Sequence, residues 1–561
     1  MGEIGRGSLV LWLLVMAYFA VFLAYPLSYV FYRAFVVGGR LSVEYFVIMA
    51  GDPVLRESIY NSFYIASLST AVTLLVGYAL AYVMVRYDFR LRGAYESLLL
   101  IPFIVPPFVG AIGMLKLFAR YGSVNLLLMG LGLIREPIDW FANRMLGIVL
   151  LEILHLYPIA YLNIAASLSN IDPTLEESAE TLGVTGLRKF LTVTLPLSLP
   201  GAAAAAAIIF IWSFTDLGTP LMFSFYKVVP VQIFSMSMEL HENPMGYALT
   251  VFVLALISIV FLGIKRYTSA RSYEMLGRGH VSRRRPRLRG PLEAAVTALI
   301  GLWLVLAALP HISIALLSVS GRWFMSVLPE EFTLQHYYTV ATNTLTATSI
   351  RNSIFYSVSA TGLAVLIGLA TAYVANRGRL PQPLRDAADT VSMWPLAIPG
   401  IALAFGYLSS FADVPLLSAY RDPTLLLIVA YTTRRLPYMV RSMYAGLQQV
   451  HRSLEEAAMS LGSRPIKVVR DVTLPLIAAN IFAGAILVFA ESMIEVSTSL
   501  MLALREQYYP ITKTIYEVST ELVNGPELAS ALGMVLMVVV ATSMILASKA
   551  IGAKMGELFR A

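Results

Sequence analysis

Long uncharged apolar runs constrain this chain more than any other feature of its sequence. The 561 residues are 58% hydrophobic and only 13% charged, with a mean hydropathy of +0.73, whereas soluble domains carry roughly 25% charged residues. A helix needs ~20 apolar residues to cross a bilayer. We therefore predict an all-α membrane protein with about twelve transmembrane helices, near residues 9–31, 59–85, 97–119, 146–169, 201–218, 246–264, 292–319, 350–375, 387–411, 425–449, 476–498 and 529–549.

The first of these spans is expected to stay in the membrane rather than to be removed as a secretion signal. The apolar stretch from Ser8 to Val37 is longer than the core of such a signal, and no convincing small-residue cleavage site follows it. The chain has no cysteine, which excludes thiolate metal sites. Its six histidines show no metal-ligand spacing, so a metal site stays unknown and no cofactor is expected.

The net charge of +7 comes from a single basic segment. Nine Lys or Arg and one Glu lie between Lys265 and Gly290, which leaves the rest of the chain near neutrality. This segment separates two apolar spans, a position typical of a cytoplasmic linker and not of a nucleic-acid-binding region. With both termini cytoplasmic, the inner segments hold 25 Lys or Arg and the outer ones 13. We predict that orientation for a multi-pass protein of the cell (inner) membrane, with the lipid bilayer as a partner and no nucleic acid.

The sequence contains a long internal repeat. The dipeptide Asn61-Ser62 recurs as Asn352-Ser353. The segments 175–197 and 454–476 are identical at 11 of 23 positions. Parallel internal repeats are a known construction of membrane transporters. We therefore predict two parallel six-helix units in three parts: a first repeat at 1–270, a basic cytoplasmic linker at 271–290 and a second repeat at 291–561.

The repeated charged segment predicts a short helix in each copy. Small or apolar residues recur at helical spacing and a glycine follows them: Leu175, Ser178, Ala179, Leu182 and Gly183, then Leu454, Ala457, Ala458, Leu461 and Gly462. Glycine at this place predicts the end of a helix. A helix of about eight residues is ~12 Å long, too short to cross a membrane or to be stable alone. Its small-residue face is expected to dock against another surface.

The start of this helix is predicted from a capping pattern. Thr174 precedes Glu177 by three residues, and Ser453 precedes Glu456 by the same spacing, which has the form of a capping box. The glutamates therefore have two readings. They either cap a loop helix that folds back on its own bundle, or belong to a paired docking surface, which the duplication favours.

The two copies approach the pattern E-A-A-x3-G-x9-I-x-L-P, and this resembles the cytoplasmic-loop signature of ATP-binding-cassette importer permeases. The matching residues are Glu177-Ser178-Ala179, Gly183, Val193 and Leu195-Pro196, then Glu456-Ala457-Ala458, Gly462, Val472 and Leu474-Pro475. Serine replaces the first alanine in the first copy, and valine replaces isoleucine in both. The resemblance covers nearly the whole chain and is similar to the fused permeases that include ferric-iron and thiamine importers.

This resemblance implies a type I importer permease fold and two kinds of partner. In that family each loop forms a coupling helix seated on one of two ATPase subunits at the cytoplasmic face, and an extracytoplasmic solute-binding protein delivers the solute. Ferric iron leads as substrate, while thiamine, phosphonate and other small solutes stay open. The implied coupling residues are Glu177, Ser178, Ala179, Leu182, Gly183, Glu456, Ala457, Ala458, Leu461 and Gly462. The chain has no G-x4-G-K-[ST] phosphate loop, so we expect it not to be an enzyme and ATP hydrolysis to occur in separate subunits.

Ionisable and polar residues within the spans are candidates for a translocation path, because burying charge in lipid is costly. The candidates are Asp216, Thr219, Arg434, Arg435, Glu495 and Thr498. Equivalent acids in the two repeats favour a cationic substrate, whereas adjacent arginines favour an oxyanion or a chelated metal. The alternative is structural: a carboxylate at a helix end fixes a loop, and the arginines pair with internal acids.

Two other classes of transport protein compete with the importer permease. A secondary transporter of the major facilitator group also has twelve helices in two sixes with a basic central loop. Its Gly/Asp/Arg-rich signature between spans two and three matches poorly with the segments 85–93 and 375–383 here. A channel does not explain a duplicated cytoplasmic helix.

Overall fold

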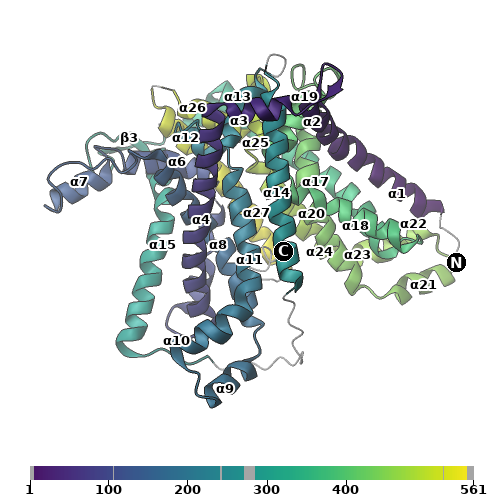
Figure 1. Ribbon diagram of the computed structural model, residues 1–561, viewed down its shortest axis with the longest axis horizontal. Coiled ribbons are helices and arrows are strands. Elements are labelled where there is room, and N and C mark those ends of the chain that lie inside the picture. The colour runs from purple at the N-terminus through teal and green to yellow at the C-terminus, as the bar shows by residue number, and fades with distance from the viewer. Residues whose placement is uncertain (1–5, 105, 240–242, 271–284, 522, 552–561) are drawn as a thin grey trace. The chain divides into compact units, whose positions relative to one another are not determined.

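The computed structural model describes residues 6–104, 106–239, 243–270, 285–521 and 523–551 (Figure 1). Within them the chain is almost entirely helical, as the apolar runs predict. The described strands form two short antiparallel hairpins: β1 (Val36–Val37) with β2 (Arg40–Leu41), and β3 (Ser320–Arg322) with β4 (Glu331–Phe332).

Eight helical stretches of the described residues are long and apolar enough to cross a membrane. They are Arg6–Phe35, Pro53–Arg86, Arg144–Ser169, Gly186–Phe214, Met245–Ile264, Gly290–Ser318, Thr344–Arg377 and Gly525–Leu546. Two bent pairs raise the number to ten if each pair is one span: Gln382–Ala397 with Gly400–Ser410, bent by 101°, and Pro465–Leu476 with Ala478–Met493, bent by 74°.

Two of the twelve predicted spans do not form a helix that is both long and apolar enough to cross a membrane. The span predicted at 97–119 is interrupted near Pro102 and Pro106, because proline cannot donate a helical hydrogen bond. The second repeat breaks at the corresponding place, where Pro399 precedes α19. The tenth span forms the 26-residue helix α20 (Thr424–Gln449), but its three arginines make it more polar than the eight long apolar stretches. The described residues therefore give eight to ten crossings.

The chain forms two compact units that do not follow the sequence repeat. Of the described residues, unit 1 contains 6–52, 232–254 and 335–551, and unit 2 contains 53–231 and 255–334. The first helix of each repeat therefore belongs to the unit that contains most of the other repeat. The predicted limits at 270 and 290 describe the repeat and stay a prediction.

Unit 2 is built around three long helices that pack side by side (Figure 1). These are α4 (Pro53–Arg86), α8 (Arg144–Ser169) and α11 (Leu195–Phe214). The other elements of the unit are α5 (Arg92–Leu98), η2 (Ile101–Ile104), α6 (Pro107–Leu117), α7 (Ser123–Gly130), α9 (Pro173–Thr181), α10 (Gly186–Lys189), η3 (Phe190–Thr194), α12 (Gly218–Met222) and α15 (Gly290–Ser318). Small residues allow this close packing, since Gly77 of α4 lies against Ala160 of α8.

Unit 1 repeats this arrangement with α17 (Thr344–Arg377), α20 and α24 (Ala478–Met493). Its remaining elements are α1 (Arg6–Phe19), η1 (Ala20–Ala24), α2 (Tyr25–Phe35), α3 (Glu44–Gly51), α16 (Gln335–Thr342), α18 (Gln382–Ala397), α19 (Gly400–Ser410), α21 (Arg452–Ser460), α22 (Pro465–Val468), η4 (Val469–Thr473), α23 (Leu474–Leu476), α25 (Ser497–Leu502), η5 (Glu506–Tyr508), α26 (Ile511–Ser519) and α27 (Gly525–Ile551). Two helices contribute residues to both units: α13 (Val229–Ser237) and α14 (Met245–Ala270).

The repeated Asn-Ser dipeptide makes the same contacts in both copies. In unit 2, the Asn61 side chain donates to the carbonyl of Lys227 at 2.9 Å, and the Ser62 hydroxyl accepts from the amide of Val229 at 2.9 Å. The second copy matches these contacts in unit 1: Asn352 with the carbonyl of Gln507 at 2.9 Å, and Ser353 with the amide of Ile511 at 2.7 Å. The dipeptide therefore ties a long helix to the start of α13 or α26.

The described end of the predicted linker belongs to the fold of unit 2. The amide of Leu288 donates to the carbonyl of Asp88 at 2.9 Å, and the amide of Asp88 donates to the carbonyl of Pro286 at 3.0 Å. The Arg285 side chain donates to the carbonyl of Val85 at 3.1 Å. Residues 285–289 are thus more than a tether, while the rest of the predicted linker, 271–284, lies outside the described residues.

Gly77 and Gly368 are equivalent in the two repeats, but alanine at the two positions is expected to lower the stability of the fold by different amounts. A Cβ at Gly77 would lie 2.3 Å from the Cβ of Ala160 and 3.0 Å from the backbone nitrogen of Tyr161, whereas at Gly368 it would meet the Cγ of Met439 at 2.6 Å. We expect Gly77→Ala to lower the free energy of unfolding by about 1–3 kcal/mol. Gly368→Ala should cost less, because a methionine side chain moves easily. Thermal unfolding of the two purified variants measures this, and equal losses would contradict it.

Candidate functional site

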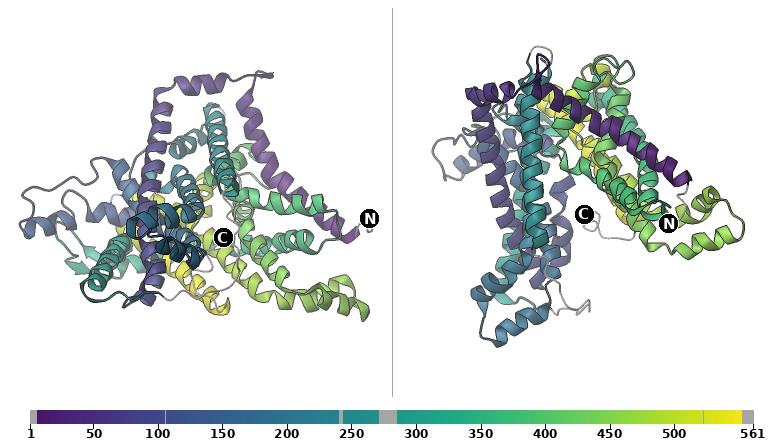
Figure 2. Two further views of the ribbon diagram at one scale, coloured as in Figure 1. Left: turned by 60° about the horizontal axis from the view of Figure 1, so that its bottom comes forward. Right: turned by 45° about the vertical axis from the view of Figure 1, so that its right-hand side comes forward.

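The two short helices predicted from the repeated segment are present as α9 and α21. Each has nine residues, close to the eight expected, and each connects two long helices of its own unit. Figure 1 shows α9 beyond the ends of α8 and α11, and the right-hand view of Figure 2 shows the same placement. A short helix therefore lies at corresponding places in both repeats.

The predicted capping boxes at the starts of these helices are wrong. The side chain of Asp172 caps α9, accepting from the amide of Thr174 at 2.9 Å, and Pro173 occupies the first turn. In α21 the N-cap residue is His451, whose side chain makes no capping hydrogen bond. Proline is favoured at the first position of a helix, so α9 begins before the Thr-Glu spacing on which the prediction relied.

The predicted helix ends are confirmed. Gly183 follows α9 with φ of +79°, and Gly462 follows α21 with φ of +85°, a region that glycine enters without steric cost. In the first copy the amide of Val184 donates to the carbonyl of Ala179, and the amide of Gly183 donates to that of Glu180, both at 2.9 Å. This is the Schellman arrangement, and the second copy repeats it.

The residues of the predicted docking stripe are not all on the exposed side of α9 and α21. Leu182 and Leu461 are 83% and 88% exposed, and Leu175 and Leu454 are about half exposed. Ser178 and Ala457 are also exposed, as are Glu177 and Glu456, but Ala179 faces the interior and Ala458 is half-buried. These leucines are left exposed at equivalent places in the two copies. One side of each helix, on which leucines lie among polar residues, is thus uncovered within the described residues.

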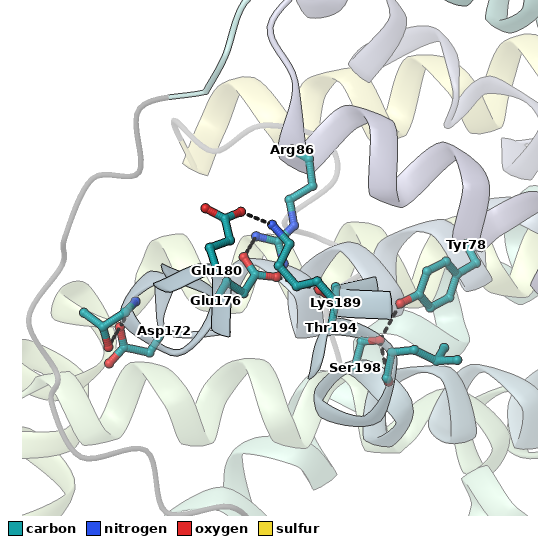
Figure 3. A network of polar contacts seen from close by, with 10 residues as sticks. Tyr78, Arg86, Asp172, Glu176, Glu180, Lys189, Thr194 and Ser198 are labelled. Atoms are coloured by element: carbon teal, nitrogen blue, oxygen red, sulfur yellow. Dashed lines mark hydrogen bonds and ion pairs between the residues drawn. The ribbon is translucent and has the colours of Figure 1, made fainter. Parts of the chain in front are cut away.

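The opposite face of α9 is held by a buried ion pair (Figure 3). The Arg86 guanidinium at the end of α4 donates to both carboxylate oxygens of Glu176 at 2.5 Å. The hydroxyl of Thr194 donates to the same carboxylate at 2.7 Å. Glu176 is 2% and Arg86 5% exposed, so the charges neutralise each other away from solvent.

The second repeat contains the same three side chains in a looser arrangement. The Arg377 guanidinium lies 3.4 Å from the carboxylate of Glu455, and the Thr473 hydroxyl donates to that carboxylate at 2.9 Å. Arg377 also donates to the carbonyls of Leu447 and Val450, at 2.8 and 2.5 Å. These carbonyls belong to the end of α20, so Arg377 divides its donors between α20 and α21.

Sequence reasoning missed this pair of networks. It emphasised the second glutamate of each Glu-Glu pair because that residue fits the family signature, whereas the first one is buried. A signal was nevertheless present. Glu176 and Glu455 are identical in the two copies, and an arginine ends the second span of each repeat at positions 86 and 377.

A π-helical segment supplies the threonine of each network at an equivalent position. These segments are η3 and η4, of five residues each, and they end at Thr194 and Thr473. Each is followed directly by Leu-Pro, at 195–196 and 474–475. π-Helical turns are rare and occur often at functional sites. The residues that hold α9 and α21 are therefore joined to an irregular start of the next long helix.

The arginines predicted for the translocation path belong to a buried ionic cluster in unit 1. Glu495 pairs with Arg434 at 2.5 Å and with Arg435 at 2.7 Å, and Glu491 pairs with Arg435 at 3.1 Å. The Glu495 side chain is 2% exposed, that of Arg435 12% and that of Arg434 23%. Two cations and two anions thus balance within α20, α24 and the turn that follows. Space around Arg434 is tight, since a Cβ at Gly400 would lie 1.5 Å from its Nη1.

Asp216 and Glu495 have one shared role and one difference. The amide of Thr219 donates to Asp216, and that of Thr498 donates to Glu495, each at 3.3 Å. Each carboxylate therefore fixes the start of a short helix, α12 or α25. In unit 2, however, the second acid of the region is Glu152, which accepts from the hydroxyl of Ser213. The structure thus assigns both carboxylates a local structural contact.

Within the described residues no three His, Cys, Asp or Glu side chains gather as a metal site. His155, which the repeat aligns with Arg434, contacts the carbonyl of Pro102 through Nδ1 at 3.0 Å.

Comparison with known proteins identifies the family. The model of the binding-protein-dependent transport system inner membrane component matches residues 73–272 and, a second time, residues 364–556. The chain belongs to this family. The permease domain is therefore duplicated within one chain, which confirms the predicted repeat and importer permease. The protein is a multi-pass component of the inner membrane whose transport depends on a binding protein, and it is not itself an enzyme.

Two similar proteins cover most of this permease. The ferric transport system permease protein FbpB of Actinobacillus pleuropneumoniae is 26% identical over 495 residues, which are 86% of this chain and 69% of the relative. The putative ferric transport system permease protein FbpB 1 of Haemophilus influenzae is 25% identical, over 86% of this chain and 76% of the relative.

A solved structure shows a weaker likeness. The bacterial ABC transporter that imports the acidic polysaccharide alginate is 18% identical, with a TM-score of 0.39, over 46% of this chain and 93% of that chain. A likeness at this level defines no feature of the permease.

Proposed function

We propose that this permease imports ferric iron, driven by two ATPase subunits that dock on α9 and α21. The iron assignment is supported by the two ferric transport permeases, each of which is similar over 86% of this chain. The docking assignment is supported by one observation: Leu182 and Leu461, at equivalent places in the repeats, are 83% and 88% exposed. An extracytoplasmic binding protein brings the iron to the opposite face.

The proposed docking residues have distinct tasks. The leucines provide apolar surface for a cleft of the ATPase, and the small exposed residues Ser178 and Ala457 allow close approach. Glu177 and Glu456 are exposed and are free to meet basic groups of the partner. Ala179 and Ala458 lie toward their own unit, and the glycines turn the chain sharply after each helix.

The proposed membrane arrangement is twelve crossings in two parallel sixes, with both termini in the cytoplasm. It counts each bent pair as one crossing, and adds the broken helix near Pro106 and the arginine-bearing α20. Neutralised ions make α20 compatible with a membrane, because a paired charge costs far less than an isolated one. This orientation places α9 and α21 at the cytoplasmic face.

The proposed translocation path includes Arg434, Arg435, Glu495, Asp216, Thr219 and Thr498. Arg434 is the most exposed member of the ionic cluster, at 23% of its side chain, and is the one best placed to meet the solute. Glu495 and Arg435 are more buried and hold it in place.

Transport in proteoliposomes tests the proposed function. The permease is reconstituted with its ATPase and iron-loaded binding protein, and uptake of radiolabelled iron is measured. We expect uptake only when ATP is present on the side of the membrane where the ATPase lies. Replacing the phosphate-loop lysine of the ATPase should abolish uptake. Uptake driven by a proton gradient without ATP would indicate a secondary transporter. Uptake of radiolabelled thiamine or phosphonate, with no uptake of iron, would reassign the substrate.

A further inference from the structure

We infer that Arg86 with Glu176, and Arg377 with Glu455, are positioning residues that transmit movement of the docking helices to the long helices of each unit. This inference rests on the proposed docking of ATPase subunits at α9 and α21. It concerns the inner face of these helices, which the family signature leaves undescribed.

The first step of the argument is mechanical. A nine-residue helix is not stable by itself, and the apolar side chains that would anchor it, Leu175 and Leu182, are exposed. On its inner face Glu176 makes a buried ion pair and accepts a buried hydrogen bond, and Ala179 is buried beside it. Because Glu176 makes the buried charged contacts of α9, movement of α9 acts on the residues that this carboxylate binds.

The second step concerns what the carboxylate binds. Arg86 is the last residue of α4, and Thr194 ends η3, which leads directly into α11. One buried carboxylate thus joins the docking helix to two of the three long helices of unit 2 (Figure 3). Charge-assisted bidentate contacts are the strongest and most directional of ordinary hydrogen bonds. A push on α9 is therefore carried to α4 and α11 together.

The third step is the repetition of the network. Three side chains that are far apart in the sequence recur in the same relation: arginine, glutamate and threonine at 86, 176 and 194, and at 377, 455 and 473. Each threonine ends a π-helical segment. A buried ion pair adds little net stability over apolar packing, so stability alone explains such a duplicated network poorly.

The two networks predict that α9 and α21 pass movement to their long helices to different extents. Glu176 receives both donors of Arg86 at 2.5 Å, whereas Glu455 receives Arg377 at 3.4 Å. The Arg377 guanidinium also donates hydrogen bonds to the carbonyls of Leu447 and Val450. Loss of Glu176 should therefore impair transport more than loss of Glu455.

The test compares uptake with ATP hydrolysis in the reconstituted complex. Glu176→Gln keeps the shape of the side chain and an acceptor for Thr194 but removes the ion pair. We expect it to bind the ATPase as the wild type does, because the exposed leucines are unchanged. Iron uptake per ATP hydrolysed should fall about tenfold, within the range of coupling effects between sites. Glu455→Gln should give a smaller loss of the same ratio.

A second variant covers the case in which Glu176→Gln does not fold, since it leaves Arg86 unpaired. Replacing both partners, as Arg86→Met with Glu176→Met, removes the charges together, and such swaps usually preserve stability. This double variant should fold, bind the ATPase and show the same loss of uptake per ATP. Lys189→Gln is the matched control, because it removes an ion pair of α9 in which the partner Glu180 is 50% exposed.

Three outcomes decide the inference. Uptake per ATP at the wild-type level in both Glu176 variants would overturn it. Loss of ATPase binding in proportion to uptake would also overturn it, since the network would then only fold α9. Normal binding with reduced uptake per ATP, and a normal Lys189→Gln control, would support it. Failure of the proposed function is distinct, because then the wild-type permease itself binds no ATPase.

Discussion

Replacing Glu495 with glutamine is expected to lower the free energy of unfolding by about 3–5 kcal/mol, because it removes the buried anion that Arg434 and Arg435 share. Glu495 lies 2.5 Å from Arg434 and 2.7 Å from Arg435, and its side chain is 2% exposed. Glu491 lies within ion-pair distance of Arg435, at 3.1 Å, so Arg434 would lose the carboxylate with which it pairs in the described residues. Thermal unfolding of the purified permease measures the effect.

The control for this prediction is an exposed ion pair. Glu57 and Lys227 lie 2.8 Å apart with side chains about half exposed, and such pairs contribute at most about 1 kcal/mol. Glu57→Gln should therefore be nearly neutral. Gly400→Ala provides an independent route, since its Cβ would displace Arg434 without changing any charge. If Glu495→Gln were no more destabilising than Glu57→Gln, the cluster would not be a stabilising element.

Introducing aspartate at Leu182 and Leu461 together is expected to abolish ATPase binding and transport. Each leucine should bury its side chain in the complex, and burial of a leucine contributes about 1.5–3 kcal/mol. Loss of both, with two charges placed in an apolar contact, should weaken binding by at least about 100-fold. Folding should be unaffected, because these side chains are 83% and 88% exposed in the permease. Co-purification of the ATPase and iron uptake measure the two effects.

The matched control uses two exposed leucines from a different part of unit 2. Leu131 and Leu133 follow α7, between α6 and α8, and are 64% and 68% exposed. Aspartate at both positions should leave ATPase binding intact, because this loop precedes α8 whereas α9 follows it. Equal loss of binding in both double variants would reject α9 and α21 as the docking sites.

The segments that form α9 and α21 show which structural features a sequence pattern can predict. Gly183 and Gly462 marked the helix ends correctly, because a sharp turn after a helix needs a positive φ, which is a local property. The starts were misplaced, because Asp172 and not Thr174 caps α9, and α21 begins after His451 with no side-chain cap. The buried glutamates at 176 and 455 were missed, because burial depends on arginines some 80 to 90 residues earlier in the chain.

The translocation candidates show the same limit. Sequence reasoning left open whether Arg434 and Arg435 pair internally or face the solute. The structure pairs both with Glu495 and Arg435 also with Glu491. Which acids meet these arginines depends on how α24 packs on α20, and no pattern along one helix contains that information.

The sequence by itself determined the class of the protein, its internal duplication and the places of the two short helices. These follow from local properties: apolar length fits a bilayer, and repetition is visible in the residues themselves. Only the tertiary structure decided that the first helix of each repeat belongs with the other repeat, and which charges pair inside each unit. Such choices depend on contacts between residues distant in the chain, and packing selects among partners that the sequence leaves equivalent.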